Sequence, residues 1–250
     1  MLSVIIAAKN EAHNIESCLE SVTWADEVIV LDSGSSDDTV NLAIAAGVRV
    51  IENDWPGYGP QQNRGIDLAT HDWIYSLDAD ERISPELAAE ICAVIRENKF
   101  NVFDVPRRSL FVTRFMRHSG WWPDRTRRLF KKGSARFTNH KIHANLATDE
   151  AIGHLTEPMI HYSFLNYHAV VEKMNRYSSG SAQDLNEMGK QGSLGAATSH
   201  GLWAFIRTYF LQAGFLDGQL GLILAIANAE GTYYKYLKLW ELQNSKFFQK

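Results

Sequence analysis

Two aspartates separated by a single residue, Asp78 and Asp80, follow the apolar run WIYSL at residues 73–77. Side chains two positions apart on an extended segment point the same way, so both carboxylates can reach one cation. Hard oxygen ligands of this kind suit Mg²⁺ or Mn²⁺. An ordinary turn is the competing interpretation, and the next residue, Glu81, is interpreted as a turn former or helix cap.

A second acidic segment, LDSGSSDDT at residues 31–39, follows the apolar run EVIVL. Asp32 at the end of that run can accept hydrogen bonds from the base or ribose of a nucleotide. Ser36 is predicted to be the N-cap of a following helix, with Asp37 and Asp38 complementing the helix dipole.

A basic stretch, residues 107–141, holds eleven lysines and arginines and one acid, Asp124. Arginine side chains suit phosphate oxygens because their donors form a planar fork. The stretch therefore favours contact with an anion: a nucleotide diphosphate, a phosphorylated acceptor or an anionic membrane surface. For any one residue, a solvated basic face is the alternative.

Four histidines lie between residues 140 and 161, without close metal-ligand spacing such as H-E-x-x-H. A lone histidine is more often a packed or surface residue than a ligand. His161 is the candidate to complete a metal site begun by the aspartates.

The elements that must position these residues alternate along the first hundred positions. Apolar runs predict strands, and helical spacing with capping signals predicts the segments between them. The strands are expected at 2–8, 27–31, 49–51 and 73–77, and the helices at 15–22, 39–46, 61–69 and from Ser84-Pro85 onward. This order predicts an α/β fold with a mostly parallel sheet, whose ligands bind at the carboxyl ends of the strands.

Composition is that of an ordinary globular protein: 250 residues, 45% hydrophobic, 22% charged, with a formal net charge of -4. It excludes a disordered, collagen-like or coiled-coil chain, and a simple polyanion binder. Two cysteines, Cys18 and Cys92, form no disulfide framework and favour a reducing compartment. No signal peptide and no apolar stretch of about 18 residues is visible, so membrane contact is expected to be peripheral.

The sequence changes character after Asn101, and we expect two domains, at 1–160 and 161–250. Residues 180–200 are rich in Gly, Ser and Ala and predict a mobile loop or linker. Two aromatic segments, 203–215 and 220–240, are predicted helices that either lie on a membrane surface or pack as core helices.

Three segments in this order resemble glycosyltransferase family 2, the inverting nucleotide-sugar enzymes with the GT-A fold. They are SVIIAAKNEAHNIESCLESV, DEVIVLDSGSSDDT and QQNRGIDLATHDWIYSLDADERIS. Two later segments, GWWPDRTRRLF and HYSFLNYHAVVEKMNRYS, are similar to the branch that contains bacterial lipopolysaccharide-core glucosyltransferases, which glucosylate the inner-core heptose.

The resemblance implies a role for each matching position. The end of the first strand lies against the nucleotide, the first acid contacts uracil or ribose, and a helical segment runs past the nucleotide. In the Asp-X-Asp motif the second aspartate ligates the metal, and the first contacts ribose or metal-bound water. A later segment lines the donor sugar and the diphosphate. The residues are, in that order, Ala7, Ala8, Asn10 and Glu11; Asp32; Gln62, Asn63 and Arg64; Asp78, Ala79 and Asp80; and Trp121, Trp122, Asp124, Arg127 and Arg128.

One position departs from the branch, which has a glutamate, the expected catalytic base, where this chain has Ala144. An inverting transfer needs a group that takes the proton of the acceptor hydroxyl, and alanine cannot do so. The hypothesis is an inactivating substitution. The alternatives are another base, such as Asp124, His143 or Asp149, or a naturally inactive protein.

The resemblance thus implies a metal-dependent transfer of a hexose from a UDP-sugar, with Mg²⁺ or Mn²⁺ stabilising the leaving UDP. The acceptor would be a lipid-linked core oligosaccharide at the cytoplasmic face of the inner membrane, and nucleic acid is not an expected partner. Three other function classes are weighed. A sugar nucleotidyltransferase would have a glycine-rich loop after the first strand, but residues 8–11 read AKNE and contain no glycine. A dehydrogenase needs the motif G-x-G-x-x-G after a strand, and Gly34 is the only glycine in its turn, which argues against this class. A non-catalytic saccharide- or lipid-binding protein remains open because of Ala144.

Overall fold

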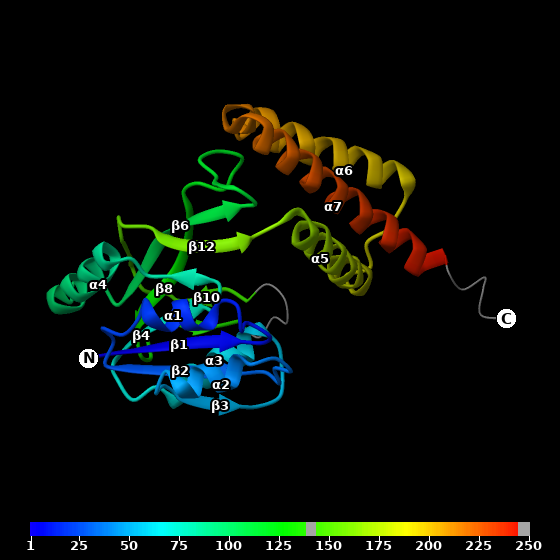
Figure 1. Cartoon of the computed structure of the whole chain (residues 1–250). Helices are drawn as coiled ribbons and strands as arrows, with labels where there is room; N and C mark the ends of the chain where they lie inside the picture. The colour runs from blue at the N-terminus through cyan, green and yellow to red at the C-terminus, as the bar shows by residue number, and fades with distance from the viewer. Residues whose placement is uncertain (139–143, 245–250) are drawn as a thin grey trace. The chain divides into compact units, whose positions relative to one another are not determined.

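The computed structural model describes residues 1–138 and 144–244. The chain divides into two compact units (Figure 1). The first unit comprises residues 1–108 and 124–162, and the second comprises residues 109–123 and 163–250. The second unit is therefore discontinuous, since residues 109–123 group with the C-terminal helices while the residues before and after them belong to the first unit.

Four parallel strands form the core of the first unit's sheet, in the order β3-β2-β1-β4. They are β1 (Leu2–Ala8), β2 (Glu27–Asp32), β3 (Arg49–Glu52) and β4 (Trp73–Asp78). Each coincides with a predicted strand to within one residue at either end. The apolar run of β1 has buried side chains on both faces of the sheet, which is typical of a central parallel strand.

The sheet continues beyond β4 in the order β8-β6-β12-β5, with β8 antiparallel to both β4 and β6. These strands are β5 (Glu81–Arg82), β6 (Val102–Phe111), β8 (Asp124–Lys131) and β12 (Met159–Phe164). Short strands β7 (Arg114–Phe115) and β11 (Ile152–His154) pair with β6, and β9 (Arg136–Phe137) with β10 (Leu146–Ala147). The predicted α/β fold with a mostly parallel sheet is confirmed.

Helices cover both faces of this sheet (Figure 1). α1 (Ile15–Glu20), α2 (Thr39–Ala45) and α4 (Pro85–Glu97) pack on one face, and α3 (Tyr58–Leu68) packs on the other. The predicted start of α4 is confirmed, since the Ser84 side chain accepts a hydrogen bond from the Leu87 N–H and Pro85 is the first helical residue.

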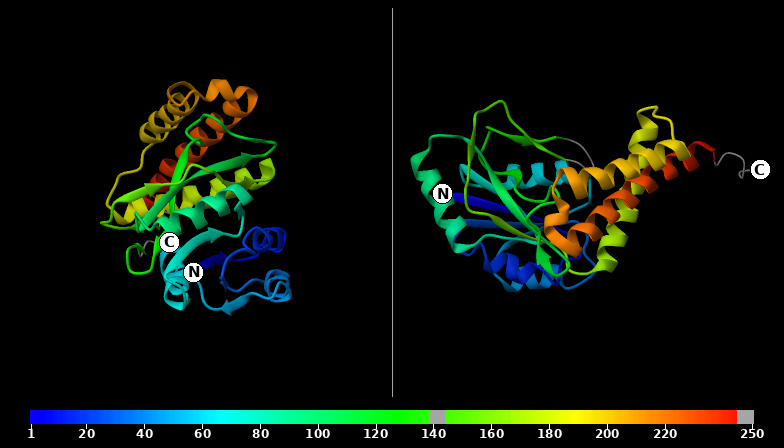
Figure 2. Two further views of the ribbon diagram at one scale, coloured as in Figure 1. Left: turned by 90° about the vertical axis from the view of Figure 1, so that its left-hand side faces the viewer. Right: turned by 90° about the horizontal axis from the view of Figure 1, so that it is seen from above.

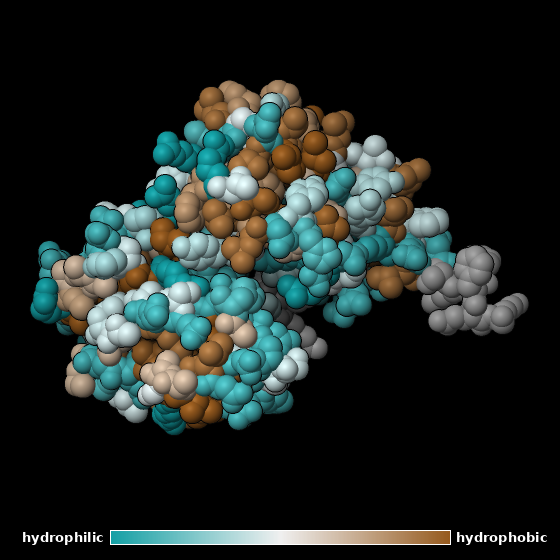
Figure 3. All heavy atoms as spheres, viewed as in Figure 1, coloured by the Kyte–Doolittle hydropathy of each residue, from teal (hydrophilic) through white to brown (hydrophobic). Residues whose placement is uncertain are grey.

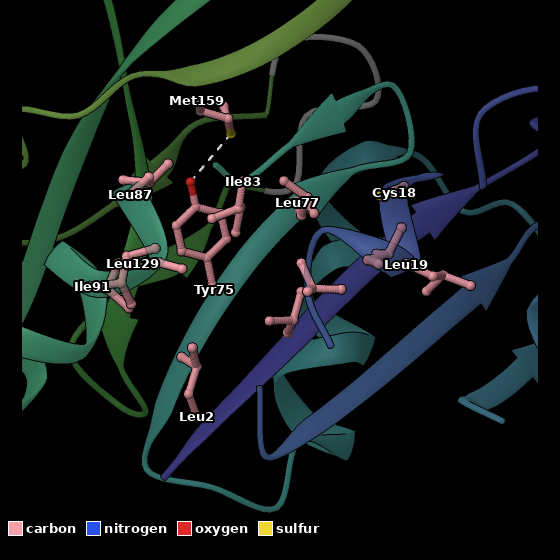
Figure 4. Close-up of a cluster of buried hydrophobic side chains, with 14 of the residues drawn as sticks. Leu2, Cys18, Leu19, Tyr75, Leu77, Ile83, Leu87, Ile91, Leu129 and Met159 are labelled. Atoms are coloured by element: carbon pink, nitrogen blue, oxygen red, sulfur yellow. Dashed lines mark hydrogen bonds between the residues drawn. The ribbon is translucent and has the colours of Figure 1, made fainter. Parts of the chain in front are cut away.

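The core packed against β4 is mostly apolar, and Figure 4 marks one hydrogen bond between its side chains. Tyr75 is fully buried among side chains of α4 and β8, and its hydroxyl lies 3.3 Å from the sulfur of Met159. Burial raises the pKa of Tyr75 well above its usual range. This packing fixes β4 and therefore the acids that follow it.

Three helices dominate the second unit: α5 (Tyr167–Glu187), α6 (Leu194–Ile206) and α7 (Gly218–Asn244). A π-helical turn (η1, Arg207–Leu211) and a 3₁₀ turn (η2, Gly214–Asp217) connect α6 to α7. Figure 2 shows α6 and α7 side by side. Buried Asp217 supports the connection by accepting hydrogen bonds from the backbone N–H groups of Arg117 and His118.

The predicted mobile loop at residues 180–200 is wrong, because only residues 188–193 lie between α5 and α6. Its small residues serve close helix packing instead. Ala182 and Ala197 are buried, and a Cβ at Gly192 would lie 2.3 Å from the backbone nitrogen of Trp240 on α7.

None of the described helices is by itself both long and apolar enough to cross a membrane. Within residues 1–138 and 144–244, one pair of helices, Leu194–Leu211 with Gly214–Asn244, meets the limits of length and composition when taken together, across a bend of 69°. Apolar residues gather on the surface of these helices (Figure 3).

Candidate active site at the carboxyl ends of β1, β2 and β4

The strand ends bring four predicted site residues into register. Ala8 lies opposite Asp32 on β2, and Ala7 lies opposite Asp78 on β4. We call this border of the sheet the carboxyl edge. Ala8 and Ala79 are both buried, so their small side chains bring the backbone close to neighbouring atoms at this edge.

Asp32 is buried and organises the turn that follows β2. One carboxylate oxygen accepts hydrogen bonds from the N–H groups of Gly34 (2.9 Å) and Ser35 (2.8 Å), and the other accepts the Ser35 hydroxyl. The prediction that Ser36 caps α2 is wrong, since Asp38 precedes the helix. The Ser36 N–H instead donates to the Asn10 side chain at 2.8 Å.

Asn10 and Glu11 connect the end of β1 to this turn. Asn10 has a φ of 56°, in the left-handed region that asparagine tolerates. The Glu11 N–H donates to the Thr39 hydroxyl at 2.8 Å. Burial raises the pKa of the Glu11 carboxyl above its usual range, opposed by a hydrogen bond from Asn14 and reinforced by the charge of Asp80.

A cluster of acids and arginines, the acid–arginine cluster, lies beside Asp78. One Arg128 nitrogen lies 2.5 Å from the Asp78 carboxylate and 2.6 Å from that of Glu81. The second Glu81 oxygen accepts the Asp78 N–H at 2.9 Å. Burial raises the pKa of the Glu81 carboxyl, against the attraction of Arg128. For Arg128, burial disfavours the charge, but the two carboxylates outweigh it and raise its pKa.

A β-bulge aims Arg128 into this cluster. Phe103 of β6 pairs with Leu129 and Asp104 pairs with Arg127, so Arg128 is the extra residue on β8. Its Nε is buried and has no hydrogen-bond partner in the described part of the chain.

Arg107 extends the cluster to Asp124. Its Nε donates to Asp124 at 2.9 Å, and another nitrogen lies 3.7 Å from Glu81. The sequence interpretation missed both Glu81 and Arg107. The available signal for Glu81 was its place directly after the paired aspartates. A turn former or helix cap does not need to be buried, whereas the Glu81 side chain is buried.

Asp80 has a different partner from Asp78. Residues 79–80 form a turn between β4 and β5, so the assumption that both aspartates point the same way from an extended segment is wrong. An Asp80 oxygen lies 3.2 Å from Nε2 of His161, which reaches it because β12 pairs with β5.

This pair fits two neighbouring ligands of one octahedral cation, whose donor atoms lie about 3 Å apart at metal–ligand distances of about 2.1 Å. Within the described residues no group of three or more His, Cys, Asp and Glu side chains could hold a metal ion. A cation at Asp80 and His161 would therefore need its remaining ligands from substrate and water.

The predicted nucleotide-binding residues of α3 make hydrogen bonds within the protein. Gln62 accepts from Ser76 at 3.0 Å, Asn63 bonds both the N–H and the carbonyl of Phe137, and Arg64 lies 2.7 Å from Asp54. Asn63 thereby attaches α3 to β9.

Ala144 lies in residues 144–145, the short loop that directly precedes β10. The Thr138 N–H donates a hydrogen bond to the Asn145 carbonyl at 3.0 Å. A Cβ at Gly59, on the first turn of α3, would lie 1.8 Å from the Thr138 carbonyl and 3.3 Å from the Ala144 Cβ. Position 144 is half-buried against α3, and the predicted alternative base His143 lies outside the described residues.

Two further predicted residues are Arg127 and Trp122. Arg127 points away from the acid–arginine cluster, and its guanidinium donates to the Leu146 carbonyl at 2.8 Å. Trp122 belongs to the second unit with Trp121, whose ring packs against Phe111 and Phe164.

A family model described as glycosyl transferase family 2 matches residues 3–149. A protein of Rickettsia conorii, named as an uncharacterized glycosyltransferase, is 31% identical over 100% of this chain and 92% of its own length. A lipopolysaccharide core biosynthesis glycosyltransferase of Rhizobium meliloti is 26% identical over 94% of this chain and 93% of its own length.

Among solved structures, glucosyl-3-phosphoglycerate synthase of Mycobacterium tuberculosis, in complex with Mn²⁺, UDP and glucosyl-3-phosphoglycerate, is 29% identical. The match covers 44% of this chain and 43% of that chain, with a TM-score of 0.38.

Proposed function

The chain belongs to glycosyltransferase family 2, and we propose that it binds a UDP-hexose, with glucose as the sugar, for inverting transfer to a saccharide hydroxyl. The observation that carries this proposal is the carboxyl edge, where Ala8, Asp32 and Asp78 end three adjacent parallel strands. Ligands of such sheets bind there.

Asp32 and the turn that it organises would hold the nucleoside. Asp80 and His161 would hold Mg²⁺ or Mn²⁺, which would supply positive charge to the diphosphate as UDP leaves. Arg128 and Glu81 act on the donor through Asp78, because they hold its carboxylate and its backbone N–H.

We propose that the chain as it stands is catalytically silent because Ala144 replaces the base. The acceptor hydroxyl would attack the anomeric carbon, and its proton needs a carboxylate or imidazole within reach. Asp124 is a poor substitute, since Arg107 engages one of its carboxylate oxygens through two nitrogens. A saccharide-binding protein without transferase activity is the second candidate, and Ala144 is the observation that favours it.

The acceptor is proposed to be a lipid-linked core oligosaccharide at the cytoplasmic face of the inner membrane. The named role of the Rhizobium relative supports the saccharide. Four exposed residues of η1 and η2 support the membrane surface: Phe210, Leu211, Phe215 and Leu216, which we call the apolar tip. Arg207 in the same connection is exposed and suits anionic headgroups.

The first test is calorimetric binding of UDP, UDP-glucose, UDP-galactose and GDP-mannose, with Mn²⁺ or with EDTA. We expect UDP-glucose to bind tightest, to need the metal, and to be lost in Asp80→Ala. Asp72→Ala is the matched control, since Asp72 is an exposed acid that directly precedes β4, whereas Asp80 lies in the turn after β4. The absence of nucleotide binding under all conditions would contradict the proposal.

The second test restores the base. Ala144→Glu is expected to raise the transfer rate roughly 10²–10⁴-fold, the usual contribution of a positioned general base. A variant that binds donor as the wild type does, but gains no transfer or hydrolysis of UDP-glucose, would favour the non-catalytic candidate.

A further inference from the structure

A cavity of about 350 Å³, the first chamber, lies within the second unit between α5, α7 and the end of β6. Aromatic rings of Phe111, Trp121 and Phe164 form one wall. The opposite wall is α7, where the small residues Ala227 and Gly231 leave the space open. Its size and mostly apolar lining are those of a ligand pocket.

Two lysines stand at this apolar cavity. The Lys173 ammonium lies 4.8 Å from the centre of the Phe164 ring, and the Lys235 ammonium lies 5.0 Å from that of Tyr236. Neither makes an ion pair with a carboxylate among the described residues. Burial lowers the pKa of Lys235, so an anion beside it would relieve an uncompensated charge.

A second chamber of about 510 Å³ adjoins the first along α7. Asn228, Thr232 and Lys235, which follow one another at helical spacing, line both chambers, as does Trp121. The second chamber is more polar and adds the exposed guanidinium of Arg207. No acidic side chain lines either chamber in the described part of the chain.

We propose that the two chambers form a binding site for an alkyl chain that carries a phosphate monoester. The alkyl chain occupies the first chamber, and the phosphate sits at Lys235 where the chambers meet. The terminal phosphate oxygens face the second chamber, which Arg207 also lines. A phosphate monoester fits better than a carboxylate because it carries nearly two negative charges and three acceptor oxygens for several cations.

This site shares no residue with the carboxyl edge, since all its residues belong to the second unit. Binding is therefore expected without nucleotide or divalent metal. It does not depend on the proposed transferase activity.

The test is calorimetric titration, in EDTA and below the critical micelle concentration, with four probes. They are a monoacylglycerol phosphate, the neutral monoacylglycerol, a fatty acid of the same chain length, and glycerol 3-phosphate. We expect the first to bind at least about tenfold tighter than each of the others. Equal binding of the fatty acid or the neutral lipid would overturn the phosphate assignment, and equal binding of glycerol 3-phosphate would overturn the alkyl site.

Two variants locate the ligand. Lys235→Gln should weaken binding of the monoacylglycerol phosphate about tenfold or more, while Lys190→Gln, an exposed lysine of the same unit, should not. Ala227→Leu fills the first chamber and should abolish binding, while Ile226→Leu on the exposed neighbouring position should not. Unchanged affinity in Lys235→Gln, with its fold verified by circular dichroism, would refute the site even if Ala227→Leu failed to fold.

Discussion

Arg128 is the residue on which the acids of the carboxyl edge depend most, because one of its nitrogens contacts both Asp78 and Glu81. Glu81 is 0% exposed, so its carboxylate has no access to water that could replace the guanidinium. Removing one member of a buried ion pair leaves an uncompensated charge, which costs more than the pair itself contributes.

Arg128→Met is therefore expected to destabilise the fold by about 3–5 kcal/mol. Because the remaining carboxyl resists ionisation, the loss should grow as pH rises above 4.5, the ordinary pKa of glutamate. Chemical denaturation at several pH values measures both effects. Arg136→Met is the control, since its pair with Asp67 is exposed and worth about 0–1 kcal/mol. Equal losses in the two variants would contradict the buried role.

Glu11→Gln tests a second carboxyl at this edge whose pKa is raised by burial. The folded pKa of Glu11 is raised above 4.5, chiefly by burial, so the folded state binds the proton more tightly than the unfolded state does. Stability from this group is present at low pH and is lost as pH rises through the raised pKa. Glu11→Gln should thus gain stability relative to wild type as pH rises from about 4 towards neutrality, measured by denaturation. Glu16→Gln, an exposed neighbour, should show no such trend.

At the scale of elements, the parallel strands were predictable because each is a local apolar run that ends in polar residues, as in LSVIIAA of β1. The antiparallel strands β6, β8 and β12 were not, because their order depends on pairing between distant segments. The small residues at 180–200 misled for a physical reason: glycine, serine and alanine permit a loop, but here they let α5 and α6 approach α7.

The site was predictable to a similar degree. Asp32 and Asp78 were placed at strand ends by sequence, and they do lie at the ends of the two strands that flank β1. The pairing of Asp78 with Arg128 depends on a bulge in β8, which has no sequence signal that we recognise.

Gly59→Ala tests how α3 supports the loop at position 144. The added Cβ would collide with the Thr138 carbonyl, so the backbone at Thr138 must shift at a cost of about 1–3 kcal/mol. Thermal unfolding measures the loss. Gly195→Ala on α6 is the control, since the atom nearest to the added Cβ would lie 3.9 Å away. This variant should be neutral or stabilising. A neutral Gly59→Ala would mean that α3 and the loop are not in close contact in solution.

At the scale of the whole molecule, the proposed membrane contact rests on the apolar tip. Leu211 and Leu216 are 66% and 59% exposed, and each would contribute about 1.5–3 kcal/mol if fully buried in lipid. The double variant with Leu211→Ser and Leu216→Ser should bind anionic vesicles at least about tenfold more weakly, as measured by sedimentation with the vesicles. Met188→Ser, which alters an exposed side chain at the end of α5, should leave it unchanged. Vesicle binding that survives loss of both leucines would exclude the tip as the contact.

The discontinuity of the second unit determines how the protein can be dissected. Ending the chain at Tyr162 would remove the packing partners of residues 109–123. Phe111, Met116 and Trp121 would then be exposed to solvent, which promotes aggregation. Arg107 and Asp124 are, however, the last paired residues of an antiparallel β6–β8 ladder. A two-residue Asn-Gly turn between them would close that ladder as a hairpin. An excised first unit should therefore be soluble only when residues 108–123 are replaced by such a turn. Separating the two units thus requires joining Arg107 to Asp124 through that turn, in addition to ending the chain at Tyr162.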